Sequence, residues 1–105
     1  MDDSEFEVLA DSTLRQIETA FEASGIDADV SETGTGILEI EFPDGSKMVV
    51  NRHVANQEIW VAARSGGYHF RWDGAAWRDT RGQGELLPIL SRLISQIVGQ
   101  SVAFG

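Results

Sequence analysis

Acidic side chains gather in the first third of this 105-residue sequence, and carboxylates are groups that bind hard cations. Residues 1–32 contain ten acids and a single base, Arg15, so they account for the whole net charge of −9. The remaining residues hold seven acids and seven bases. A field segregated in this way repels nucleic acid and anionic lipid, and it attracts cations and basic protein surfaces. Acids also aid solubility, but solubility does not require their segregation.

Four of these acids fall on one stripe of a helix predicted over residues 4–24. At 100° per residue, they lie within about 80° of one another on the helical wheel; they are Glu7, Asp11, Glu18 and Glu22. Glu18 and Glu22 are i,i+4 neighbours, and like charges at this spacing destabilise a helix by about 0.2–0.5 kcal/mol. Only Arg15 compensates them, so ligand binding explains the stripe better than folding does.

The other residues capable of chemistry exclude several classes of site. The absence of cysteine excludes disulfides, thiol nucleophiles and cysteine-ligated zinc or clusters. The two histidines, His53 and His69, form neither an HxxH nor an HExxH pair, and no Glu-x-x-His motif of a di-iron site is present. No EF-hand or phosphate-binding loop occurs. We therefore expect a protein that is not an enzyme and whose exposed carboxylates bind cations weakly.

Two helices are predicted at the ends of the chain. Ser4 and Glu7 fit a capping box for the first helix, and Gly25 provides a left-handed end. Helical periodicity places an apolar face on this helix; it comprises Phe6, Leu9, Ala10, Thr13, Ile17, Ala20 and Phe21. The second helix is predicted over residues 85–98 and ends at Gly99.

The middle of the chain predicts about six short strands joined by tight turns. They are expected at residues 29–33, 37–42, 47–51, 58–64, 68–72 and 77–79. Short connections between neighbouring strands favour an antiparallel sheet. The fold class is therefore α+β, a two-layer sandwich with both helices on one sheet face, in a single domain over residues 1–105.

The other sheet face should then be open to solvent, which makes its side chains informative. Alternation places Ile59 and Val61 toward the core and leaves Trp60 outside, beside Asn51, His69 and Arg71. An exposed tryptophan in such surroundings indicates a docking surface. Two alternatives stay open at this point: a loop could bury Trp60, or the register could be shifted by one residue.

Three segments of the sequence resemble the bacterial frataxin (CyaY) family, in order and over essentially the whole chain. They are Ser4-Glu5-Phe6 with Leu9-Ala10-Asp11, then Asp44-Gly45-Ser46-Lys47 with Val50-Asn51-Arg52, then Ile59-Trp60-Val61-Ala62 through Gly66-Gly67-Tyr68-His69-Phe70 to Trp77. The central segment from Asp44 to Phe70 is the most specific. The resemblance implies a frataxin-like sandwich with a flat antiparallel sheet.

The resemblance also implies a function in iron–sulfur cluster assembly, through contact with the cysteine desulfurase and the scaffold protein. Partner binding maps to Asn51, Trp60 and His69. Iron, as Fe²⁺ or Fe³⁺, would bind weakly to an acidic ridge, with other divalent cations as alternatives; the ridge comprises Asp11, Glu18, Glu22, Asp27 and Asp29. Two questions stay open: whether the protein donates iron or regulates the assembly, and whether it is a monomer or forms an iron-dependent oligomer. The alternative function is an acidic module that docks a basic partner, with metal binding incidental.

The expected compartment is the bacterial cytoplasm. No apolar run approaches the roughly 18 residues that a membrane-spanning helix needs. The N-terminus, Met1-Asp2-Asp3-Ser4-Glu5, is acidic, whereas a secretory signal or a mitochondrial transit peptide would be basic there. We therefore expect a protein that binds neither membranes nor nucleic acid.

Overall fold

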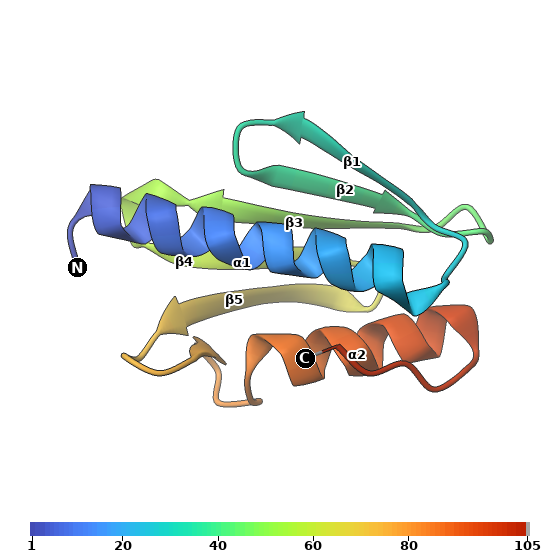
Figure 1. Cartoon of the computed structure of the whole chain (residues 1–105). Helices are drawn as coiled ribbons and strands as arrows, with labels where there is room; N and C mark the ends of the chain where they lie inside the picture. Colours follow the sequence, from blue (N-terminus) through green and yellow to red (C-terminus); the bar gives the residue numbers. More distant parts are fainter. Residues whose placement is uncertain (105) are drawn as a thin grey trace.

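The computed structural model describes residues 1–104, and residue 105 lies outside the described part. Along the chain, helix α1 (Asp3–Ser24) precedes all the strands and helix α2 (Leu86–Val98) follows them (Figure 1). The predicted α+β architecture is confirmed. Within residues 1–104, neither helix is both long and apolar enough to cross a bilayer.

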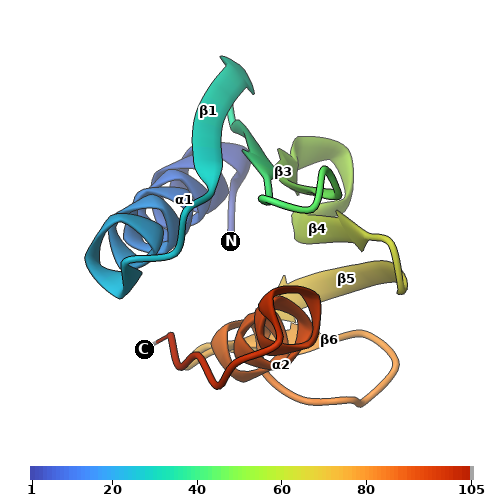
Figure 2. The ribbon, with the colours of Figure 1, turned by 90° about the vertical axis from the view of Figure 1, so that its right-hand side faces the viewer.

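The six strands form one antiparallel sheet in which each strand pairs with its neighbours in sequence. Figure 2 shows both helices on the same side of this sheet, so the opposite face carries no helix. The strands are β1 (Asp29–Gly34), β2 (Ile37–Glu41), β3 (Lys47–His53), β4 (Glu58–Ala63), β5 (Gly66–Trp72) and β6 (Trp77–Asp79). A short 3₁₀ turn, Val54–Asn56, links β3 to β4.

The N-cap of helix α1 is Asp2, two residues before the predicted cap Ser4. The Asp2 carboxylate, not the Ser4 hydroxyl, accepts a hydrogen bond from the Glu5 backbone N–H at 2.8 Å. The Glu5 carboxylate accepts in return from the Asp2 N–H at 3.3 Å, which completes a capping box earlier in the chain than expected. The predicted end is confirmed, because Gly25 adopts a left-handed φ of 75°.

The core lies between the helices and the sheet. Phe6, Ile17 and Phe21 of α1 are buried against it, together with an apolar stripe of α2. One buried polar contact crosses the layers, where the Trp77 indole N–H donates to the Thr13 hydroxyl at 2.9 Å. The C-terminal tail closes one end, since the ring of Phe104 packs edge-on against Phe21 at 4.9 Å.

Strands β3 and β5 each extend two residues beyond a predicted end, and this matters for the open face. The prediction ended β3 at Asn51, whereas its pairing continues to His53, which lies opposite Glu58 of β4. Strand β5 begins at Gly66 rather than Tyr68. Glycine is depleted in strands and Arg52 and His53 are not apolar, so the local pattern missed pairings that the neighbouring strand imposes.

The turn between β5 and β6 is organised by Asp73. Its carboxylate accepts the backbone N–H groups of Ala75 and Ala76, both at 2.8 Å, and contacts the Arg78 guanidinium. Hydrogen bonds from the Ala76 and Ala75 N–H groups, followed by that from Arg78, lower the pKa of Asp73 to about 2.

This lowered pKa predicts an acid-dependent loss of stability. The carboxylate stabilises the fold fully above its unfolded pKa of about 3.9, and this contribution disappears as the pH falls through the folded pKa. We expect Asp73→Asn to be less stable than wild type at pH 7, and the difference to shrink between pH 4 and pH 2. Urea unfolding at several pH values measures this, with exposed Glu41→Gln as the control. A constant difference across that range would contradict it.

Candidate functional site

The acidic ridge divides into two parts in the structure. Asp11 and Glu18 of α1 face Glu32 of β1 across a groove of about 110 Å³, which Arg15 also lines. The other ridge acids, Glu22, Asp27 and Asp29, are exposed and lie outside this groove. Sequence reasoning did not place Glu32 with the ridge, because a strand facing a helix is not visible in helical periodicity.

Asp11 has a partner that the sequence did not predict. The Arg52 guanidinium on β3 donates to its carboxylate at 2.6 Å. The arginine side chain is only 12 % exposed, whereas that of Asp11 is 42 % exposed. Arg52 passes over Gly36, where a Cβ atom would lie 2.5 Å from Arg52 Nε, so any larger residue there would displace the arginine. The first ridge acid is thus partly neutralised.

The ridge is an open surface rather than a chelating pocket. Within residues 1–104, no three histidine, aspartate or glutamate side chains gather closely enough to hold a metal ion. Carboxylate oxygens remain suitable donors for iron. The arrangement can therefore attract cations by its summed field and bind them weakly, with solvent completing the coordination.

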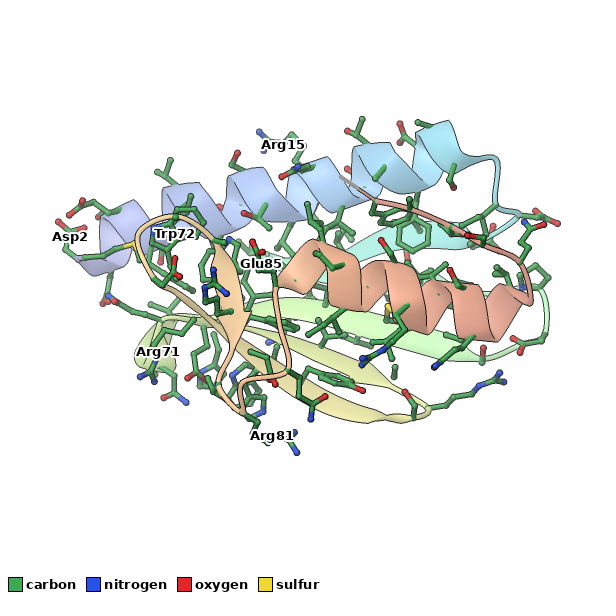
Figure 3. All side chains as sticks on the ribbon, turned by 90° about the horizontal axis from the view of Figure 1, so that it is seen from below. Asp2, Arg15, Arg71, Trp72, Arg81 and Glu85 are labelled. Carbon is green, nitrogen blue, oxygen red and sulfur yellow. The ribbon has the colours of Figure 1, made fainter. Side chains whose placement is uncertain are left out.

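The open sheet face carries the three predicted partner-binding residues in one row. Asn51 of β3 pairs with Trp60 of β4, which pairs in turn with His69 of β5. Trp60 is half-buried and no loop covers it completely, so the predicted register and partial exposure are both found. Figure 3 shows Arg71 pointing away from the helices and Trp72, the next residue, lying on the helix side.

Trp60 lies in a stack of three rings. Its indole is sandwiched between the imidazoles of His53 and His69, with ring centroids 3.9 and 4.3 Å away and planes tilted by 9° and 8°. His53 was missed as a site residue because the predicted strand stopped before it. His53 lies two residues beyond Asn51, the residue that pairs with Trp60, and aromatic side chains at such diagonal positions on neighbouring strands can reach each other.

Comparison with known proteins agrees with this fold. Residues 1–100 match the profile of the frataxin-like domain family. The chain is 56% identical to the iron–sulfur cluster assembly protein CyaY of Dechloromonas aromatica over 102 residues, covering 97% of each chain. It is 51% identical to the protein of the same name from Cupriavidus metallidurans, covering 94% of this chain and 92% of the relative.

Solved structures give the same result. Frataxin from Psychromonas ingrahamii superposes with a TM-score of 0.92 and 33% identity, covering 100% of this chain and 99% of the other. Trimeric frataxin from the yeast Saccharomyces cerevisiae, complexed with ferrous, superposes with a TM-score of 0.68 and 26% identity over 91% and 87% of the two chains. The sequence resemblance is confirmed, and the chain belongs to the frataxin-like family.

Proposed function

We propose that this protein binds iron weakly through its acidic ridge and regulates, or supplies iron for, iron–sulfur cluster assembly. The observation that carries this proposal is the segregation of the entire net charge of −9 into residues 1–32, which form α1 and lead into β1. The CyaY relatives are named as iron–sulfur cluster assembly proteins, which supports the same function. Iron is the cargo here, and no catalytic step is assigned to the protein.

The proposed ligands are Asp11, Glu18, Glu22, Asp27 and Asp29. Glu32 joins them, because it faces Glu18 across the groove between α1 and β1. A metal bound near Asp11 competes with Arg52 for the same carboxylate. Binding should therefore be strongest at the Glu18 end of the groove, away from this ion pair, and sensitive to salt.

The proposed partners are a cysteine desulfurase and a scaffold protein, which dock on the open sheet face around Asn51, Trp60 and His69. A row that includes a half-exposed tryptophan is typical of a hot spot in an interface. The protein would act in the cytoplasm as a monomer, and iron would favour an oligomer; a trimeric frataxin is known from yeast.

A cluster-assembly assay tests this function. Purified desulfurase and scaffold are supplied with cysteine and Fe²⁺ under anaerobic conditions, and cluster formation on the scaffold is followed by absorbance with and without this protein. A change in the initial rate that depends on protein concentration is expected. An unchanged rate at saturating protein would contradict a role in assembly.

One observation favours a second candidate, an acidic module that docks a basic partner. Asp11 already binds an arginine, Arg52, so the ridge can bind guanidinium groups as well as metal ions. Two measurements separate the candidates: Fe²⁺ titration of the protein alone, and capture of the desulfurase in the presence of a chelator. Capture without measurable iron binding would favour the second candidate.

A further inference from the structure

A buried carboxylate lies on the sheet face that should be open to water. Strand alternation puts Glu58 on the same face as Trp60, yet Glu58 is only 4% exposed. Burying a charged group is unfavourable unless it is paired and hydrogen-bonded. The contacts of this side chain therefore explain why a glutamate occupies the position.

Both oxygens of this carboxylate hold residues of the proposed docking face. Oε1 accepts a hydrogen bond from the Trp60 indole Nε1–H at 2.8 Å. Oε2 accepts one from the Arg71 guanidinium, also at 2.8 Å. The His69 Nδ1 atom lies 3.8 Å from Oε1. One side chain thus contacts three neighbours drawn from β4 and β5.

The contact with Glu58 restricts the motion of the Trp60 indole at its edge, whereas the ring stack contacts only its two faces. His53 and His69 cover the two faces of the indole, and Glu58 holds its N–H edge. A tryptophan fixed on both faces and at one edge has little rotamer freedom left to lose. Binding a partner then requires less ordering of side chains, which favours affinity.

We propose that Glu58 is a positioning residue that holds Trp60 and Arg71 in the arrangement required for docking, without contacting the partner itself. This proposal rests on the proposed use of the open sheet face. It adds Arg71, whose side chain is 65% exposed although its tip is held by Glu58, to the docking surface. The geometry favours a carboxylate at position 58, because an amide would present an N–H group to one of these two donors.

The first test needs no partner. The indole N–H of Trp60 is identified by nuclear magnetic resonance, since its signal disappears in Trp60→Phe, and its exchange with solvent is compared with that of Trp72. No hydrogen bond from the Trp72 indole occurs within residues 1–104, which makes it an internal reference. We expect exchange at Trp60 to be slower by about tenfold, because its acceptor is a buried carboxylate. Equal exchange would overturn the proposal.

The second test measures affinity for the purified desulfurase and scaffold. Glu58→Gln keeps the shape but cannot accept from both donors, and Glu58→Asp keeps the charge but is shorter. Each variant is expected to lose about tenfold in affinity while its melting curve stays cooperative. Glu41→Gln, which removes one charge from the exposed last residue of β2, is the matched control and should bind as wild type does.

The outcomes distinguish this proposal from the function on which it rests. Normal binding by both Glu58 variants, together with lost binding by Trp60→Ala, would refute positioning and leave the docking face intact. Normal binding by Trp60→Ala would instead refute the docking face. If Glu58→Gln does not fold, Glu58→Asp and the exchange measurement on the wild-type protein decide the question.

Discussion

Trp60→Ala is expected to weaken binding of the purified desulfurase or scaffold by about 30-fold or more. Truncating a central tryptophan of an interface typically costs at least about 2 kcal/mol of binding free energy, which corresponds to that factor. Trp60 sits between Asn51 and His69 in the row of the open face, and its ring is already held in place. Calorimetric titration at fixed ionic strength gives the dissociation constants of the wild type and of the variant for each partner.

The same substitution should leave the protein folded. Trp60 is not part of the buried core, but two ring stacks and one hydrogen bond are lost with it. We expect a decrease of about 1–2 kcal/mol in the free energy of unfolding.

Trp72→Ala is the matched control, because Trp72 lies on the helix side of the same sheet and contacts Trp77. It should lose stability without losing affinity. An unfolded Trp60→Ala variant would show that this residue supports the core, and the docking assignment would then fail.

Glu18→Gln combined with Glu22→Gln is expected to weaken Fe²⁺ binding by about tenfold or more and to stabilise the iron-free protein. A carboxylate about 4 Å from a divalent cation contributes about 2 kcal/mol even at the dielectric constant of water. Removing the like-charge pair should raise the free energy of unfolding of the iron-free protein by about 0.2–0.5 kcal/mol. Anaerobic Fe²⁺ titrations and thermal melts measure the two effects.

Salt and iron give two further signatures of the ridge. Monovalent salt should stabilise the wild type more than the double variant, because it screens a repulsion that the variant lacks. Fe²⁺ should raise the melting temperature of the wild type more than that of the variant, since a ligand that binds the native state stabilises it by mass action.

A control variant removes the same amount of charge elsewhere. Asp3→Asn with Glu85→Gln takes two charges from exposed positions at the starts of α1 and α2, and neither residue lines the groove between α1 and β1. It should bind Fe²⁺ nearly as the wild type does. Equal losses in both double variants would mean that only net charge matters, and unchanged iron binding in the ridge variant would remove the site assignment.

Much of the architecture could be predicted from the sequence, because it depends on local periodicity. Apolar positions at helical spacing identified the buried face of α1, including Phe6, Ile17 and Phe21. Period-two alternation put Ile59 and Val61 in the core and Trp60 on the other face. Short turns between the strands implied the antiparallel order that the sheet has.

The charge segregation was also visible in the sequence, but the pairing of individual charges was not. Asp11 and Arg52 are 41 residues apart, and their contact depends on how α1 lies across β3 and on the missing side chain of Gly36. Glu32 reaches the groove for a similar reason, since β1 lies beside α1 in the folded protein (Figure 2). No local pattern encodes either approach.

The burial of Glu58 was decided by tertiary structure alone. Alternation correctly assigned it to the face opposite the core, where a glutamate is ordinarily hydrated. Trp60 and Arg71 instead donate hydrogen bonds to it, and His53 of β3 is its pairing partner on the neighbouring strand. Alternation specifies the face on which a side chain lies, whereas its exposure depends on the size and hydrogen bonding of neighbours on adjacent strands.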